Sequence, residues 1–187
     1  MPQNDINSKY VEFLNEALSA ENAAVDRITS RMDQTPFPEL KQRLHQHLEE
    51  THNQQERLAQ VITQLGGKPT ESKAQLPILA PPATTPIKKT AKEPLESITD
   101  DKKDNPLPEE MELMQLKQDT LVEGAEIVGY ETLIEITQKI DGLPNDEILP
   151  AIKQSLQEEK DMHRWCKNNM PMAVGVLLPK ILSAINK

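Results

Sequence analysis

Cysteine and aromatic residues are scarce in this sequence. Cys166 is the only thiol among 187 residues, which excludes an internal disulfide and a cysteine-based zinc site. Two Phe, two Tyr and one Trp are the only aromatic residues, so a core would be built from aliphatic side chains and Met. A single thiol suits a reducing compartment, and we therefore predict a cytoplasmic protein.

An excess of positive charge is also lacking. The chain carries 21 Lys and Arg against 30 Asp and Glu, which gives a formal net charge of -9 and a pI of about 5.0. The attraction to phosphate that dominates binding to nucleic acids and anionic membranes is therefore missing. We predict that neither is a partner.

No apolar run has the length of a membrane span. The most apolar stretch, over 172–185, is interrupted by Pro179 and Lys180 and is shorter than the roughly 20 residues that a span requires. We expect it to form a short helix that docks on the rest of the protein. Residues 1–5 show no basic stretch followed by an apolar run, so no secretory signal is predicted.

Apolar residues at steps of three and four predict two helices in the first third of the chain. The first covers about 7–32, and the second follows a turn at Pro36 and Pro38 and ends at Gly66 and Gly67. Because the turn is short, the two helices form an antiparallel hairpin over 7–67. The apolar stripes consist of Val11, Leu14, Leu18, Val25, Ile28 and Met32, and of Leu40, Leu44, Leu48, Leu58, Ile62 and Leu65.

The character of the chain changes over 68–108. Eight of the 15 prolines fall there, mixed with Lys, Thr and Asp, and the helical period disappears. Two more helices follow, and a connection of this length can return along a bundle so that the second and third helices run parallel. We predict an all-α four-helix bundle, with one domain over 1–187. Its parts are the hairpins 7–67 and 109–170, the crossover 68–108 and a C-terminal docking helix over 171–187 that begins where Pro171 ends the fourth helix.

Polar residues interrupt the apolar stripes of the first and fourth helices. Glu21 is the one polar member of its stripe, and Glu159 and His163 lie one turn apart on theirs. A buried carboxylate costs several kcal/mol unless it is paired or binds a metal ion. A carboxylate and an imidazole at this spacing can hold one metal ion; pairing between polar residues is the alternative. The stripes expected for the third and fourth helices are Met114, Leu121, Ala125, Val128, Thr132 and Ile136, and Ile148, Ile152, Leu156, Glu159, His163 and Cys166.

The second and third helices each offer acidic candidates. A Glu-x-x-His spacing at 49–52 matches that of di-iron bundles, but a projection at about 100° per residue puts both residues on the outer side. Glu50 and Gln54 fall on one inward flank, with His47 nearby. We prefer Glu50 as a ligand, with Gln54 one turn on, where a histidine would be the stronger ligand. In the third helix we rank Glu126 before Glu123, for which a surface position, a place behind the ligands and a ligand role all stay open.

One acidic position near the middle of each of four helices predicts a site for a pair of metal ions. Carboxylates and imidazole in an open helical cage suit iron or manganese, and the absence of thiolate ligands argues against a structural zinc ion.

Short segments along all four predicted helices resemble segments of a known protein family. They are Ala20 and Glu21; His47 through Thr51 and Glu56 through Leu58; Val122, Glu123 and Glu126 with Tyr130, Thr132 and Leu133; and Glu158 through Lys160 with Trp165 and Asn169 through Pro171. Through them the chain resembles the YciE/YciF family of ferritin-like proteins over nearly its whole length.

This resemblance implies a ferritin-like bundle, often dimeric, with a di-iron-type site and a role in stress response. Two features depart from the family pattern: Gln54 is not a histidine, and the crossover is longer and richer in proline. By motif position the resemblance assigns to the metal site Glu21, Glu50, Gln54, Glu123, Glu126, Glu159 and His163.

Three functions compete at this point. The leading hypothesis is a di-metal carboxylate protein that oxidises ferrous iron or consumes peroxide. The alternative is a non-catalytic helical scaffold or interaction protein in which the acidic cluster is degenerate, since fold alone does not decide function. A partner-binding role or a solvated linker is indicated by the lysines of the crossover, Lys88, Lys89, Lys92, Lys102 and Lys103.

A second apolar row on the third helix indicates a surface that contacts another chain or another part of this chain. Leu113, Leu116, Ile127 and Ile134 lie away from the expected main stripe, and an exposed apolar row usually marks a contact surface. We predict that the row packs against a second chain, in a homodimer, or under the crossover and the C-terminal helix.

Overall fold

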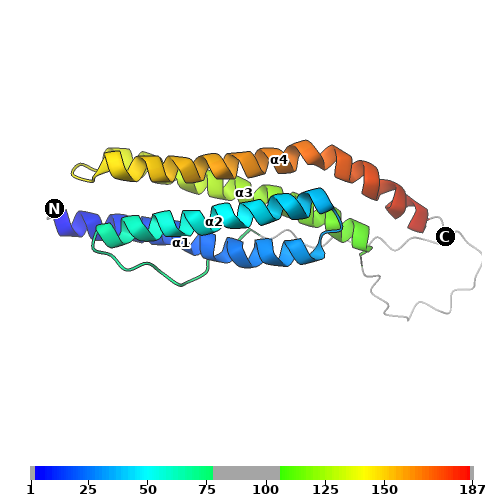
Figure 1. Cartoon of the computed structure of the whole chain (residues 1–187), viewed down its shortest axis with the longest axis horizontal. Helices are drawn as coiled ribbons and strands as arrows, with labels where there is room; N and C mark the ends of the chain where they lie inside the picture. The colour runs from blue at the N-terminus through cyan, green and yellow to red at the C-terminus, as the bar shows by residue number, and fades with distance from the viewer. Residues whose placement is uncertain (1–2, 78–105, 186–187) are drawn as a thin grey trace, which may run out of the picture.

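The computed structural model describes residues 3–77 and 106–185, and four long helices make up most of this part of the chain (Figure 1). They are α1 (Gln3–Gln34), α2 (Pro38–Gln64), α3 (Pro108–Lys139) and α4 (Asn145–Ile185), and these two ranges contain no strand. The predicted all-α four-helix bundle is confirmed, and the first three helices begin and end within a few residues of the predicted positions.

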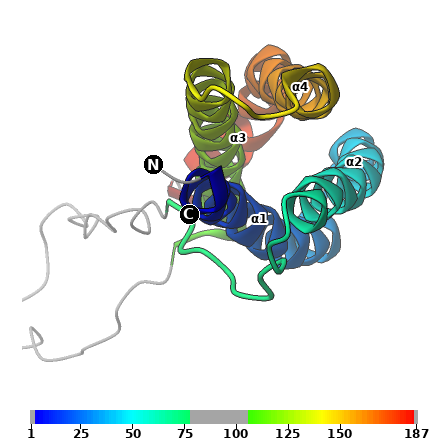
Figure 2. The same ribbon diagram turned by 90° about the vertical axis from the view of Figure 1, so that its left-hand side faces the viewer.

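The helices form two antiparallel hairpins, α1 with α2 and α3 with α4, and α2 runs parallel to α3 (Figure 1). In the end-on view of Figure 2 they occupy the corners of a four-sided bundle. Helix α1 also packs against α3, and α2 packs against α4. The central part of the predicted crossover, with the five lysines considered above, lies outside the described residues.

Glycine ends two of the helices. Gly66 has φ +81° and Gly142 has φ +86°, a left-handed conformation that side chains with a Cβ rarely adopt. After α2 the amide of Gly67 donates to the Ile62 carbonyl at 2.9 Å. A Cβ at Gly67 would lie 2.5 Å from Val11 Cγ1, so this turn can pack against α1 only with glycine.

The predicted break at Pro171 and the separate C-terminal helix are wrong. Helix α4 continues through Pro171 and Pro179 to Ile185. Each proline removes one backbone hydrogen bond and bends a helix, and the C-terminal part of α4 does curve away in Figure 1. Ala173 and Leu177 on this part are buried against Leu116 of α3 in a shared apolar cluster, and this burial offsets the lost hydrogen bonds.

The predicted inward face of α3 is also wrong. Val128 is 61% exposed and Leu121 is 44% exposed, while the polar side chains of Asp119, Glu123 and Glu126 are buried. The spacing of apolar residues predicted the wrong face of α3 because the inward face of this helix carries the carboxylates. In α4 the buried stripe contains Ser155 and Met162 where Leu156 and His163 were expected.

Two apolar clusters, one toward each end of the bundle, form the core. Leu14, Leu18, Leu58 and Ile152 belong to one cluster, and Ile28, Leu40, Leu44 and Met162 belong to the other. Between them each helix contributes buried polar side chains to a central layer. The members of this layer are Glu21 of α1, His47, Thr51 and Gln54 of α2, Glu123 and Glu126 of α3, and Ser155 and Glu159 of α4.

The second apolar row of α3 is largely covered within the chain. Leu116 is buried together with Ala173 and Leu177, and Leu113 packs against the same cluster. For these two residues the prediction that the row lies under the C-terminal helical segment is confirmed. Among the described helices, none combines the length and the apolar character needed to span a membrane.

Candidate metal centre

Three side chains from three helices converge in the central layer. His47 Nε2 lies 3.1 Å from Glu123 Oε2 and 3.7 Å from Glu159 Oε2. All three residues are buried, and their ligand atoms lie within 4.8 Å of one another. One imidazole nitrogen and two carboxylate oxygens at this spacing could hold a metal ion.

The orientation of His47 is fixed from its other ring nitrogen. His47 Nδ1 lies 3.0 Å from Glu50 Oε2, which also accepts a 3.0 Å hydrogen bond from Arg43. Glu50 Oε1 accepts a 2.8 Å bond from Gln46. Both oxygens of Glu50 are therefore occupied on the outer side of the layer. A carboxylate behind a histidine holds the imidazole so that Nε2 points at the site.

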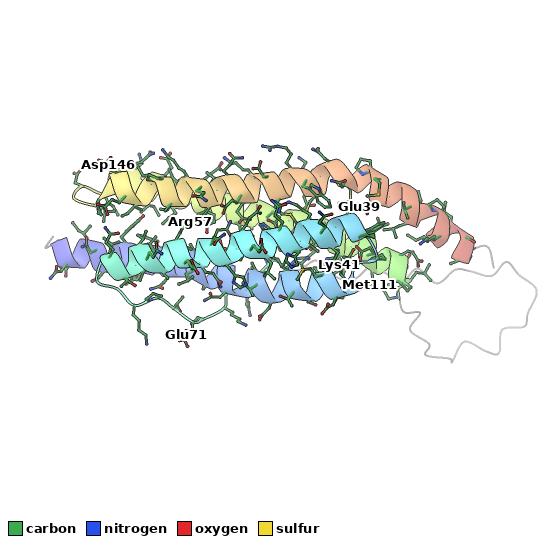
Figure 3. All side chains as sticks on the ribbon, in the orientation of Figure 1. Glu39, Lys41, Arg57, Glu71, Met111 and Asp146 are labelled. Carbon is green, nitrogen blue, oxygen red and sulfur yellow. The ribbon has the colours of Figure 1, made fainter. Side chains whose placement is uncertain are left out.

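Gln54 connects α2 to α4 beside the three-residue group. Its Nε2 donates to Glu159 Oε1 at 2.5 Å and to Glu158 Oε2 at 3.1 Å. Glu158 is also paired with Arg57, which Figure 3 labels between α2 and α4 and which donates to Ser155 Oγ at 3.2 Å. These bonds tie α2 to α4 and hold Glu159 in place.

Glu21 and Glu126 extend the layer toward α1. Tyr130 of α3 donates a 2.5 Å hydrogen bond to Glu21 Oε1, and both residues are buried. Glu126 lies one turn before Tyr130 on the same helix and is buried as well. Counted with Glu123 and Glu159, four carboxylates from three helices meet in the interior.

Several polar atoms of this layer have no hydrogen-bond partner among the described residues. They are Gln54 Oε1, Glu126 Oε1 and Glu159 Oε2, whereas Glu123 Oε2 is paired with His47 Nε2. Leaving a buried acceptor unpaired costs about 1–3 kcal/mol, and folded proteins avoid it in most positions. Three such oxygens in one layer fit a bound cation, because oxygen ligands held ready for a metal would show this pattern.

Charge pairing in the layer centres on His47 and Glu123. Burial alone would lower the pKa of His47, but the carboxylates of Glu123, Glu50 and Glu126 raise it to about 10. Burial alone would raise the pKa of Glu123, but the charge and hydrogen bond of His47 lower it below its ordinary value. Without a metal ion, an imidazolium therefore neutralises one carboxylate.

The other carboxylates hold protons more firmly than usual. Burial raises the pKa of Glu21 to about 7, against the lowering effects of Tyr130 and His47. Burial also raises the pKa values of Glu126 and Glu159 well above the ordinary value, and the neighbouring carboxylates add to the effect. Burial thus favours the protonated forms of these carboxylates when no cation is bound.

A second buried polar cluster provides a contrast. Arg31 donates to Asp119 Oδ2 at 2.9 Å and to Glu112 Oε1 at 3.0 Å, and Arg27 also pairs with Asp119. Thr35 donates to Glu112 Oε1 at 3.0 Å. Two cations and two carboxylates balance here, and every carboxylate oxygen has a partner. This cluster is a structural network, whereas the central layer has surplus acid and unpaired oxygens.

The structure brings together six of the seven residues that the sequence nominated. Glu123, Glu159 and Gln54 are at the centre, and Glu21 and Glu126 adjoin them. Glu123, ranked below Glu126 from the sequence, belongs to the three-residue group, and Glu50 lies behind His47. His163 is outside that group. It lies half-buried in an outer groove between α3 and α4, where its Nε2 would be 3.8 Å from a Cβ at Gly124.

The residue that the sequence reasoning missed is His47. A signal for it exists, because residues 40, 44, 47, 51, 54, 58 and 61 of α2 recur at alternating steps of four and three and are all buried. His47, Thr51 and Gln54 are the polar members of that series. The projection was centred on Leu44, Leu48, Thr51 and Leu58, and of these only Leu48 is partly rather than fully buried.

Comparison with known proteins supports the fold and gives a family. Residues 5–176 match the family described as "Domain of unknown function (DUF892)". A crystal structure of a protein from Xanthomonas campestris pv. campestris is similar, with a TM-score of 0.67 and 19% sequence identity. The match covers 94% of this chain and 97% of that one, and at this identity it shows the fold alone. The curated proteins include no match.

Proposed function

We propose that this chain, which belongs to the DUF892 family of domains of unknown function, binds a pair of redox-active metal ions in its central layer and oxidises ferrous iron or consumes peroxide there. The observation that carries the proposal is the buried group of His47, Glu123 and Glu159, flanked by two further carboxylates. Paired metal ions in helical bundles are held by carboxylates and imidazole that project inward from all four helices.

The ligand roles follow from the positions of the side chains. His47, Glu123 and Glu159 would hold one ion, and Glu21 and Glu126 would serve the second, with Glu123 and Glu159 between the two groups. Gln54 Oε1 is a further neutral oxygen without a hydrogen-bond partner among the described residues. Glu50 would act through His47, since its own oxygens are already bonded to Arg43 and Gln46.

Two ferrous ions bound in this layer would supply the two electrons that reduce hydrogen peroxide to water. The side chains of the layer have the complementary task of holding and giving up protons. Burial favours the protonated forms of Glu126 and Glu159 in the metal-free state, whereas a bound metal ion would favour the ionised forms. Tyr130 donates to Glu21 Oε1 and keeps that carboxylate in a fixed orientation.

The donor set suits iron and manganese, and we place iron first on the sequence resemblance. Carboxylate oxygens with one imidazole and no thiolate suit both metals, and Cys166, though buried, lies on the α4 stripe beyond Met162.

We extend the proposal, on the sequence resemblance, to membership of the YciE/YciF group, a role in stress response, a cytoplasmic location and a homodimer. Exposed Met172, Val176 and Leu182 on α4 support a contact surface for a second chain.

Elemental analysis of protein purified without chelators is the first experiment. We expect iron or manganese at close to two ions per chain, and at most one ion per chain in the variant His47→Ala. His163→Ala is the matched control, because His163 was nominated from the sequence but lies in the outer groove. If His163→Ala loses metal and His47→Ala keeps it, our assignment of the imidazole ligand is wrong.

The second experiment tests redox chemistry. Ferrous iron is added aerobically, and in parallel with peroxide, to metal-free protein, and ferric absorbance is followed against a buffer control. We expect faster oxidation with the wild type, and loss of the excess rate in the double variant with Glu21→Ala and Glu159→Ala. Equal background rates for both proteins, with no stoichiometric metal, would support the non-catalytic scaffold instead.

A further inference from the structure

A cavity of about 420 Å³ lies between α1 and α3, next to the central layer. Its walls are mainly apolar and include Phe13, Ala17, Val122 and Leu133. Ligand pockets of small molecules typically measure about 300–1,000 Å³ and combine apolar walls with a few polar groups. Small side chains on both helices create the space, and a Cβ added at Gly129 would meet nothing within 4 Å.

An extended segment over 68–77 forms one wall of this cavity. Its residues run beside α1, as Glu71 labelled in Figure 3 shows. Ala74 donates from its backbone to the Ser19 carbonyl at 2.8 Å, and Asn22 donates to the Ser72 carbonyl at 3.0 Å. At its far end the Pro77 carbonyl accepts a hydrogen bond from Gln118 of α3. The segment therefore bridges α1 and α3 beside the cavity.

The inner wall of the cavity is part of the proposed metal centre. Glu21, Glu126 and Tyr130 all line it. Glu21 Oε1 and the Tyr130 hydroxyl are bonded to each other, but Glu126 Oε1 has no partner among the described residues, although Glu126 is only 8% exposed. An apolar chamber thus ends at an unpaired acceptor oxygen.

We propose that this cavity binds a small uncharged molecule with an apolar body and one O–H donor, placed so that the donor faces Glu126 and the metal centre. An alcohol, a phenol and an organic hydroperoxide share this chemistry. The inference extends the proposed function by naming the class of molecule that the centre would act on, and so rests on it. The test of ligand binding uses metal-free protein, so its outcome does not depend on whether the central layer binds metal ions. Failure of the cavity proposal can therefore be told apart from failure of the proposed function.

Charge complementarity decides against ionic ligands. The described residues that line the cavity include no Lys, Arg or His, so the only ionisable carboxyl groups that an anion would meet, those of Glu16, Glu21 and Glu126, carry no positive charge to attract it. A cation would have to leave water for mainly apolar walls, and metal ions bound by Glu21 and Glu126 would repel it. An uncharged donor avoids both penalties and can use the unpaired Glu126 oxygen.

Phenol is a suitable probe because toluene matches its size and shape but lacks the hydroxyl group. Titration calorimetry of the metal-free full chain should show phenol binding about fivefold more tightly than toluene, the effect of one net hydrogen bond. Glu126→Leu should remove this preference while toluene still binds. Benzoate should bind at least tenfold more weakly than phenol. Equal binding of benzoate, or no phenol binding to the wild type, overturns the proposal.

A cavity-filling variant tests the location. Gly129→Leu places a side chain in the open space and should weaken phenol binding at least tenfold, without loss of metal stoichiometry. Gly175→Leu is the matched control, since a Cβ at this helical glycine of α4 also meets nothing within 4 Å. Circular dichroism checks that both variants keep their helical content. Unchanged phenol affinity in folded Gly129→Leu would place the binding elsewhere and contradict the proposal.

Discussion

Replacing Glu21 by glutamine should stabilise the metal-free protein at neutral pH while it weakens metal binding. Glu21 is 1% exposed and is held by a hydrogen bond from Tyr130. The glutamine side chain has nearly the same shape and keeps an oxygen that can accept this bond. Glu21→Gln therefore removes a buried charge with little change in packing.

The size of the effect follows from the pKa of Glu21, which is raised from 4.5 to about 7 in the folded protein. Between these pH values the folded chain holds a proton that the unfolded chain has lost, so the free energy of unfolding falls as pH rises. At about 1.4 kcal/mol per pKa unit, the loss reaches about 3 kcal/mol at pH 7 and above. Glutamine does not titrate, so the variant avoids this loss.

Urea unfolding of chelator-treated protein, followed by circular dichroism between pH 5 and pH 8, measures the effect. The wild type should lose stability with rising pH, and the difference between Glu21→Gln and wild type should grow from pH 5 to pH 7. Glu16→Gln is the control, because Glu16 is exposed on the same helix. Parallel curves for wild type and Glu21→Gln would show that Glu21 is ionised at no cost and would refute the reasoning.

Three further predictions concern neighbouring parts of the bundle. Tyr130→Phe removes the donor to Glu21 Oε1 and should weaken metal binding about tenfold or more in a competition titration with a chelator. Arg31→Met leaves the buried Asp119 without its main partner and should lower the free energy of unfolding by about 3–5 kcal/mol in urea titrations. Leu177→Ala should cost about 2–5 kcal/mol in the same assay, because Leu177 is buried on the C-terminal part of α4, whereas Leu182→Ala at an exposed position should change it by less than about 0.5 kcal/mol.

The helices and part of the site could be predicted from the sequence because α1 and α2 keep regular apolar stripes. Glu21 was recognised as the one polar residue among apolar neighbours, and the structure buries it. A buried carboxylate can be recognised from the sequence only where the other residues of its stripe are apolar. Helix α1 meets this condition because it places a single carboxylate in the interior near its middle.

The same reasoning failed for α3 because its interior face carries several polar residues. Glu123, Glu126 and Tyr130 face inward, and apolar Val128 faces outward, so apolar spacing selected the wrong side. The error in α4 was smaller, a rotation by one residue that exchanged Met162 for His163. Proline rules also misled at Pro171, where burial of the following turns keeps the helix intact.

The organisation of the interior separates stability from function. The two apolar clusters and the balanced Arg31 network hold the helices together outside the central layer. In the metal-free protein the positive charge of His47 offsets part of the surplus of acid, and burial favours the protonated forms of Glu126 and Glu159. Because metal ligands must be deprotonated, metal affinity should rise with pH across the neutral range. A centre of this kind can exchange its metal without unfolding, which suits a protein that takes up and oxidises iron more than one that uses metal as a structural support.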